Sequence, residues 1–96
     1  MAKGYWVAHV TVTDAEHYEN YKLGARPAFQ KYGAKFLVRG GSHEFPEGPG
    51  RERHVVIEFE SYADALACYR SPEYQAAMQH RLAHAQSEIV IVEGVD

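Results

Sequence analysis

The stretch Gly33–Gly41, GAKFLVRGG, combines a glycine that can end a helix, a five-residue strand pattern and two glycines that can begin a loop. Side chains alternate between the two faces of a strand. Phe36 and Val38 are therefore predicted on one face. Leu37 and Arg39 are predicted on the other. One face is purely apolar and the other carries an arginine, which indicates a sheet whose second side meets something other than open water.

Length and composition restrict the class of protein. The 96 residues suffice for one domain, residues 1–96, and are too few for two. A formal net charge of −3 leaves no basic surface for nucleic acid, so that partner is not expected. The apolar runs fall far short of the ~20 residues that span a bilayer, so no membrane association is expected. A single cysteine, Cys68, excludes an internal disulfide and fits a reducing compartment, and the N-terminus lacks the apolar core of a signal peptide. A cytoplasmic protein is predicted.

Four segments have the alternation and the β-branched or aromatic content of strands. In the first, Trp6, Ala8, Val10 and Val12 form an apolar face. Between the second and third, Ser42–Glu52 contains two prolines and two glycines and is predicted to be an exposed loop. The four predicted strands are Tyr5–Val12, Lys35–Arg39, Arg53–Glu60 and Glu88–Glu93.

The first helix is predicted between the first two strands. Thr13-Asp14 supplies a cap at its start, and Thr13 and Glu16 have the spacing of a capping box. Pro27 removes an amide donor and clashes with the preceding turn, which predicts a kink or a break near Ala25-Arg26. Gly33 is placed where a left-handed residue ends a helix.

The second helical region is predicted in two pieces. Ser61 with Asp64 caps the first piece, and Ser71-Pro72-Glu73 begins the second with a cap, a proline and an acid that favours the helix dipole. The apolar stripe predicted for the second piece consists of Tyr74, Ala77, Met78, Leu82 and Ala85.

The order strand, helix, strand occurs twice, which is the βαββαβ arrangement of the ferredoxin-like α+β fold. It predicts a four-stranded antiparallel sheet with the helices on one face. The other face carries Val7, Leu37 and Val56 and is too apolar for open water. Pairing it with the sheet of a second copy would cover it, so a homodimer, a dimeric α/β barrel, is predicted.

Five motifs together resemble one known family. They are GYW-x-A-x-V at Gly4–Val10, KYGAKFLVRGG at Lys31–Gly41, VIEF at Val56–Phe59, YRSPEYQAA at Tyr69–Ala77 and I-V-x-V-E-G at Ile89–Gly94. Nearly the whole chain is similar to the bacterial domain-of-unknown-function 1330 family of the dimeric α/β-barrel superfamily. The resemblance implies a ferredoxin-like subunit and a dimer of facing sheets. Related families include cofactor-independent monooxygenases, isomerases and lactone-processing enzymes, but this family has no established activity.

Three polar residues are predicted on the mixed face of the sheet. If the first and third strands pair in parallel, His9 and Glu58 can lie on adjacent central strands, with Arg39 on the second strand next to the third. Histidine can move a proton near neutral pH and arginine can hold a carboxylate or an enolate, so the trio could bind an anionic or carbonyl-bearing ligand. The alternative is structural: Arg39 and Glu58 form an ion pair with His9 hydrogen-bonded beside them.

A second candidate group lies on the last helical piece. Arg81 falls on the apolar stripe with Tyr74, and Tyr69 and Ser71 lie near the start of the helix. These residues could line one end of a cavity whose helix amides favour an anion. In the alternative, Ser71 is only a cap and Arg81 extends to the rim.

No metal or cofactor is expected. His80 and His84 are four residues apart on a helix, but no third ligand is evident nearby. Cys68 has no second cysteine at CxxC spacing and is expected to be a small buried hydrophobe. The chain also lacks a phosphate-binding loop, a Rossmann fingerprint, a flavin motif and a Ser-His-Asp signature.

Three functions fit these residues. The leading one is a homodimer that binds a small organic molecule, which can be anionic, between sheet and helices. The second is a cofactor-independent isomerase or monooxygenase with His9 as base and Arg39 as anion stabiliser. The third is a structural dimer without a ligand, in which the polar trio fixes subunit register. The sequence identifies no substrate, reaction or pathway, and no role for Ser42–Glu52.

Overall fold

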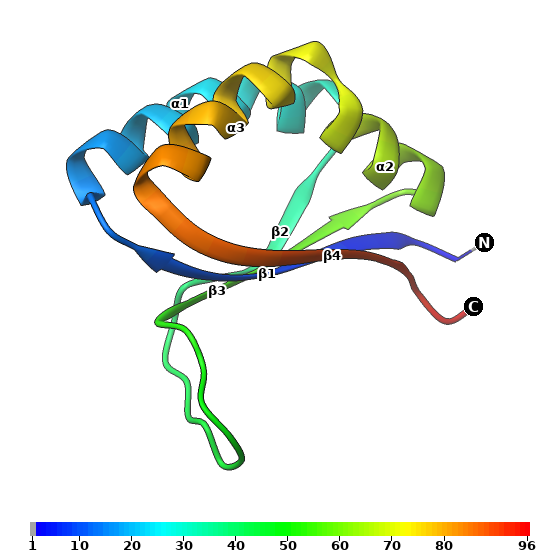
Figure 1. Cartoon of the computed structure of the whole chain (residues 1–96). Helices are drawn as coiled ribbons and strands as arrows, with labels where there is room; N and C mark the ends of the chain where they lie inside the picture. Colours follow the sequence, from blue (N-terminus) through cyan, green and yellow to red (C-terminus); the bar gives the residue numbers. More distant parts are fainter. Residues whose placement is uncertain (1) are drawn as a thin grey trace.

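The computed structural model describes residues 2–96 and has the ferredoxin-like βαββαβ fold (Figure 1). One antiparallel sheet has the strand order β2-β3-β1-β4, and the helices cover one face of it. The predicted fold class is therefore confirmed. The elements are β1 (Gly4–Val12), α1 (Ala15–Lys31), β2 (Lys35–Arg39), β3 (Arg53–Phe59), α2 (Tyr62–Arg70), α3 (Pro72–His84) and β4 (Ala85–Glu93).

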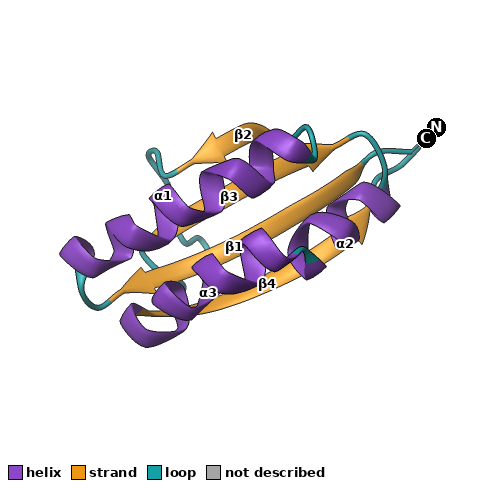
Figure 2. Cartoon of the chain, turned by 90° about the horizontal axis from the view of Figure 1, so that it is seen from above, coloured by secondary structure: helices purple, strands orange, loops and turns teal. Residues whose placement is uncertain are grey.

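The helices form one layer above the sheet, with α1 alongside α3 (Figure 2). The opposite face of the sheet has no helix, and from it the segment between β2 and β3 projects as a long loop (Figure 1). Both termini lie at one end of the sheet, where the amide of Gly94 donates to the carbonyl of Lys3 at 2.7 Å. Among residues 2–96, no helix has the length and apolar character needed to cross a membrane.

Strand β1 supplies the centre of the core. Trp6, Ala8 and Val10 are buried beneath the helices, as the alternation predicted. The Trp6 ring packs edge-on against Tyr74, with centroids 4.9 Å apart, and its indole N–H donates to the carbonyl of Ala65 at 2.8 Å. Burying a side chain of this size contributes about 2–3 kcal/mol, so this face anchors the helix layer.

Helix α1 runs on where a break was predicted. Of the predicted cap residues Thr13 and Asp14, Asp14 is the N-cap, because it has extended backbone and its carboxylate accepts from the amide of His17. The helix continues through Pro27 to Lys31. Ala25 and Ala28 on either side of the proline are fully buried, and this packing compensates for the lost hydrogen bond.

Two glycines have distinct roles at α1. Gly24 lies against α3 so closely that a Cβ there would be 3.1 Å from the Cβ of Ala77, which explains the close approach of the two helices. Gly33 has a φ of +70°, the left-handed conformation predicted for a residue that ends a helix.

The second helical region is broken at Ser71, as predicted. Ser61 and Ser71 accept hydrogen bonds from the amides of Asp64 and Tyr74, so each caps one piece. The predicted stripe of α3 is partly wrong: Leu82 is 57% exposed, and Arg81, 5% exposed, takes the buried place. Helix α3 ends at His84, so Ala85 belongs to β4, which starts three residues earlier than predicted.

The helix-free face carries a broad apolar area. Val7 of β1 pairs with Val56 of β3 on one side and with Val90 of β4 on the other. Val90 is 54% exposed, and Val92 and Leu37 are also exposed. We call this surface, formed by Val7, Leu37, Val38, Val56, Val90 and Val92, the open face.

Candidate functional site

A cavity of about 430 Å³ lies between the sheet and α1, on the helix side. We call it the helix-side cavity. It is lined by residues of α1 and of all four strands, together with Arg81 of α3. Its apolar lining includes Trp6, Ala8, Val10, Phe29, Phe36, Val55, Ile57 and Ile89, and its polar or charged lining includes Tyr18, Tyr21, Lys22, Arg26, Arg39, Arg53 and Arg81.

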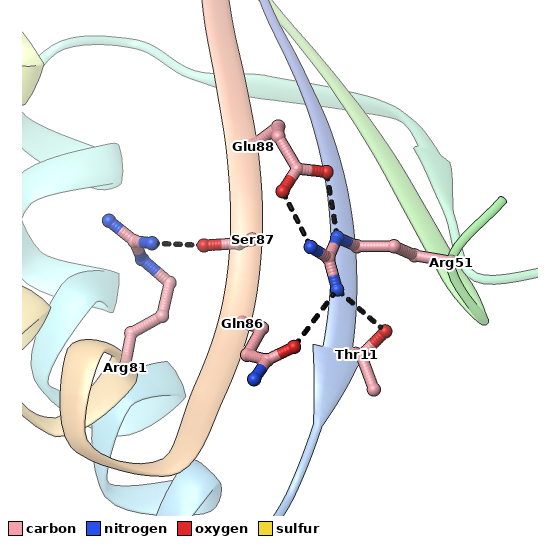
Figure 3. A network of polar contacts seen from close by, with 6 residues as sticks. All are labelled: Thr11, Arg51, Arg81, Gln86, Ser87 and Glu88. Atoms are coloured by element: carbon pink, nitrogen blue, oxygen red, sulfur yellow. Dashed lines mark hydrogen bonds and ion pairs between the residues drawn. The ribbon is translucent and has the colours of Figure 1, made fainter.

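Two arginines in this cavity have unused donors. Arg53, at the start of β3, and Arg81 each have a buried Nε atom that donates no hydrogen bond within residues 2–96. Another nitrogen of Arg81 donates to the hydroxyl of Ser87 on β4 (Figure 3). Neither guanidinium is in an ion pair with a carboxylate among the described residues. A buried cationic donor without a partner is costly, so the cavity favours an anion.

Tyrosines surround the two arginines. The hydroxyls of Tyr21 and Tyr74 are hydrogen-bonded at 2.9 Å, and the Arg81 guanidinium lies 5.7 Å from the centroid of the Tyr21 ring. Burial raises the pKa of Tyr18 and raises that of Tyr21 further. Arg53 and Arg81 act against the rise at Tyr18. These phenols are therefore neutral hydrogen-bond donors at physiological pH and not bases.

Arg39 lies on the helix side of the sheet, opposite to the prediction. Strand β2 has a β-bulge between Phe36 and Val38, after which Arg39 pairs with Val55. The bulge reverses the alternation, so Val38 takes the open face and Arg39 the face of Phe36. The guanidinium lies 3.7 Å from the centroid of the Phe36 ring and lines the helix-side cavity. The ion pair predicted between Arg39 and Glu58 is therefore wrong.

His9 and Glu58 lie on the adjacent central strands β1 and β3, as predicted, but they do not face each other. Strands β1 and β3 pair antiparallel, so His9 faces His54 across the ladder and Glu58 faces Tyr5. The hydroxyl of Tyr5 donates to the Glu58 carboxylate at 3.3 Å. The parallel pairing on which the trio depended is wrong, and its three members occupy separate places in the subunit.

The other candidates near Arg81 lie in the helix layer. Tyr74 is fully buried, and the hydroxyl of Ser71 donates to the carbonyl of Cys68 at 2.7 Å while accepting from the amide of Tyr74. The hydroxyl of Tyr69 donates to the sulfur of Met78 at 3.4 Å. Of the four residues in this group, Arg81 lines the helix-side cavity.

Burial also determines the state of Cys68. The thiol is fully buried, and burial raises its pKa to about 12. It is therefore protonated and unreactive at neutral pH, as expected for a cysteine that serves as a small hydrophobe.

A second, more open hollow of about 700 Å³ lies on the other side of the sheet, beneath the loop between β2 and β3. Nδ1 of His9 and Nδ1 of His54 are 2.8 Å apart, and the ring of His43 packs against His54 with centroids 4.7 Å apart. Burial, reinforced by His43 and His9, lowers the pKa of His54. We call this the histidine hollow. It is lined by His9, Thr11, His43, Glu44, Phe45, Pro49, Gly50, Arg51, His54 and Glu88.

One arginine ties the loop to the sheet. Arg51 makes two hydrogen bonds to the carboxylate of Glu88 on β4, both 2.7 Å long, and a third to the hydroxyl of Thr11 on β1 at 3.1 Å (Figure 3). These contacts lower the pKa of Glu88. In Figure 3, Arg51 and Arg81 reach β4 from opposite sides, because Ser87 and Glu88 are successive strand residues.

Sequence reasoning missed Arg53, Tyr18 and Tyr21 as cavity residues. The available signal was alternation along β3, which puts Arg53 on the face of Val55 and Ile57. An arginine at a strand end is ordinarily at the surface, so that signal was weak. Sequence reasoning also paired His84 with His80, whereas in the structure His84 lies against Asp14 and His17.

The fold is that of a ferredoxin-like subunit, and comparison with known proteins agrees. The family model described as "Domain of unknown function (DUF1330)" matches residues 3–95. The chain therefore belongs to this family, as its motifs predicted. No curated protein matches the chain.

Solved structures show where this fold recurs. A protein of unknown function from Rhodopseudomonas palustris has a TM-score of 0.80 at 21% identity, covering 99% of this chain and 84% of its own. The cofactor-independent oxygenase SnoaB from Streptomyces nogalater has a TM-score of 0.67 at 14% identity, with 100% and 96% covered. A dimeric ferredoxin-like protein of unknown function from Thermobifida fusca has a TM-score of 0.61 at 15% identity, with 98% and 92% covered. At these identities the likeness establishes the fold alone.

Proposed function

We propose that this protein binds a small organic anion in the helix-side cavity, as a homodimer whose subunits meet through the open face. One observation carries the binding proposal: Arg53 and Arg81 each have a buried Nε atom without a partner among the described residues, and both side chains line a cavity of about 430 Å³. That volume suits a small ligand, and the apolar walls suit a ring or an alkyl chain. A carboxylate between the arginines would satisfy the unused donors.

Two features support the dimer. The open face exposes valines on β2 and β4 in one sheet surface, which water solvates poorly. Among similar structures, those from Thermobifida fusca and Bacteroides fragilis are described as dimeric proteins with a ferredoxin-like fold. A second copy packed on this face would bury the valines and place the histidine hollow next to the subunit interface.

The chemistry of the helix-side cavity favours binding over catalysis. Its tyrosines are neutral phenols, and the one carboxylate that lines it, Glu19, is in an ion pair with Lys22 at 2.9 Å. His9, the predicted base, lines the hollow on the other side of the sheet. His9 and Arg39 therefore cannot act on one ligand within a subunit.

A cofactor-independent enzyme is the second candidate, supported by the fold shared with the oxygenase SnoaB. Such an enzyme would place its substrate in the same cavity, with Arg53 and Arg81 stabilising an enolate as its negative charge develops. Substrate turnover that is lost in Arg81→Met would support it. A location in the cytoplasm, consistent with the buried free thiol of Cys68, is part of either proposal.

Binding can be tested with 1-naphthoate, a flat aromatic carboxylate, and with its uncharged analogue 1-naphthamide. Titrations followed by ¹H–¹⁵N NMR should show a preference for the anion and shift the amide signals of Ile57 and Arg81. Arg53→Met and Arg81→Met should each weaken naphthoate binding by about tenfold or more, because each removes a charge-assisted hydrogen bond.

Arg70→Met is the matched control, since Arg70 is an exposed arginine of α2 outside both hollows. It should bind naphthoate as the wild type does. Equal affinity for acid and amide, or shifts confined to the open face, would contradict the anion site. A cavity that takes up no probe would leave the structural dimer as the remaining interpretation.

A further inference from the structure

A separate group of polar side chains lies where α1 begins and α3 ends. Oδ2 of Asp14 lies 2.7 Å from Nδ1 of His17 and 3.9 Å from Nδ1 of His84. The two imidazole rings are stacked with centroids 4.6 Å apart. None of the three residues lines the helix-side cavity or the histidine hollow, so the group is independent of the proposed binding function.

These residues offer a recognised set of metal ligands. One ligand atom from each of Asp14, His17 and His84 can be chosen so that all three lie within 4.8 Å of one another. Two imidazole nitrogens and one carboxylate oxygen suit zinc and its first-row neighbours, with Zn–N and Zn–O distances of about 2.0–2.2 Å. Because the side chains of Asp14 and His17 are 41% and 54% exposed, small rotations can bring the ligands together and water can complete the coordination.

The main chain holds the ligands in place before any ion arrives. The amides of Thr13 and Asp14 both donate to the carbonyl of His84, at 2.9 and 3.3 Å. Oδ1 of Asp14 accepts from the amide of His17 as the helix cap, while Oδ2 is hydrogen-bonded to Nδ1 of His17 at 2.7 Å, a contact in which an ion would replace the shared proton. Main-chain hydrogen bonds thus hold the start of α1 against the end of α3. A bound ion would therefore need to order only three side chains.

We propose that Asp14, His17 and His84 form a binding site for a divalent transition-metal ion of the zinc type. The carboxylate and the two neutral imidazoles leave a net charge of +1 on the complex, with a coordination position open to water or an anion. Because the ligands come from the two ends of the α1–α3 pair, the ion links these helices and stabilises the native chain by mass action.

The test uses untagged protein stripped with EDTA, dialysed and titrated with Zn²⁺ at pH 7.5. Calorimetry should show one ion per subunit, and the melting temperature should rise with Zn²⁺ concentration. Co²⁺ should give visible d–d absorption. His17→Ala and His84→Ala should each weaken Zn²⁺ binding by about tenfold or more, since each removes one of three protein ligands.

Two variants separate metal ligation from folding. Asp14→Asn keeps a good helix cap but lacks the anionic ligand, so it should match the wild-type melting temperature in EDTA and still bind Zn²⁺ less tightly. His80→Ala removes an exposed histidine of the same helix outside the group and should bind as the wild type does.

The histidine hollow provides the competing site. If His54→Ala abolishes Zn²⁺ binding while His84→Ala leaves it unchanged, the proposal is overturned. Failure of the wild type to bind Zn²⁺ saturably up to about 1 mM, where the binding free energy falls to about 4 kcal/mol, overturns it as well.

Discussion

Trp6 shows how one residue joins the sheet to the helices. It is 2% exposed, its ring meets aromatic residues of α1, α2 and α3, and its indole N–H binds a carbonyl of α2. Trp6→Phe should lower the free energy of unfolding by about 2 kcal/mol, because it leaves the Ala65 carbonyl without a partner and opens a void. Urea unfolding followed by far-UV circular dichroism measures the free energy of unfolding without tryptophan fluorescence, which the variant has lost.

The control for Trp6→Phe is Leu82→Ala, at a leucine that is 57% exposed on α3. It should change the free energy of unfolding by less than about 0.5 kcal/mol. A loss at Leu82 as large as the loss at Trp6 would mean that the helix layer packs differently from the structure described.

His54 makes stability depend on pH near neutrality. Its pKa is lowered in the folded chain by burial first, and then by His43 and His9. Below the unfolded pKa of about 6.5, the unfolded chain takes up a proton that the folded chain resists. The free energy of unfolding should therefore be maximal above pH ~6.5 and decrease as the pH falls through the folded pKa. His54→Gln should flatten this slope in urea titrations between pH 7.5 and 5.

Other charged and titratable groups near His54 can also affect the pH dependence of stability. His9, His43, Arg51, Glu44 and Glu88 share its hollow, and the pKa of Glu88 is lowered by Arg51. Because its pKa is lowered, the Glu88 carboxylate stays ionised over the pH range used and does not contribute to the slope. His80→Gln, at an exposed histidine, should keep the wild-type slope. An unchanged slope in His54→Gln would contradict the assignment.

The candidate residues show where sequence reasoning stops at this scale. Arg81 was expected on the buried stripe of its helix because helical spacing is regular, and it is buried. Arg39 was expected on the wrong face because one bulged residue reverses the alternation, and no feature of KFLVR marks the bulge. The partners of His9 and Glu58 depended on a parallel pairing of β1 with β3, which the antiparallel sheet predicted from the order of the elements already excludes.

At the scale of elements, the loop between β2 and β3 depends on one contact. Arg51 forms two hydrogen bonds to the carboxylate of Glu88 and one to the hydroxyl of Thr11. These contacts hold the end of the loop against β4 and β1. Arg51→Ala should release the loop, so amides of residues 41–52 should exchange hydrogen faster while the sheet keeps its protection. Hydrogen–deuterium exchange by mass spectrometry measures both regions in one experiment.

Arg51→Lys tests the geometry of that contact. A lysine keeps the charge but cannot form the two parallel hydrogen bonds to a carboxylate, so exchange in the loop should be intermediate. Equal exchange in wild type and Arg51→Ala would show that other contacts, such as Phe45 against the ring of His54, hold the loop.

Element boundaries were predictable where a local hydrogen bond sets them. The predicted roles of three boundary residues are confirmed: Ser61 and Ser71 are helix caps, and Gly33 is the left-handed residue after α1. Caps and left-handed ends depend on the residues themselves, so the sequence predicts them. The predicted break near Pro27 and the predicted burial of Leu82 are wrong because tertiary packing decides both. Buried alanines keep α1 continuous, and Arg81, which lines the helix-side cavity, is buried in place of Leu82.

At the scale of the whole molecule, the fold followed from the order of its patterns. Two strand–helix–strand units and two apolar sheet faces suffice to predict a covered side and an uncovered side, and both are found. The helix-side cavity was not predictable in detail, because its volume depends on how far α1 stands from β2 and β3. Side-chain periodicity carries no information about that distance.

The uncovered side of the sheet is the proposed dimer interface. Val90 lies beside Val7 on the open face and is 54% exposed, whereas Leu82 lies on the helix layer and is 57% exposed. The wild type should sediment as a dimer at micromolar concentration. Val90→Glu should shift it to monomer, because the dimer would have to bury a carboxylate without a partner. Leu82→Glu adds the same charge at equal exposure and should leave the dimer intact. Analytical ultracentrifugation distinguishes these outcomes, and a dimer that Leu82→Glu dissociates and Val90→Glu does not would place the subunit interface on the helices.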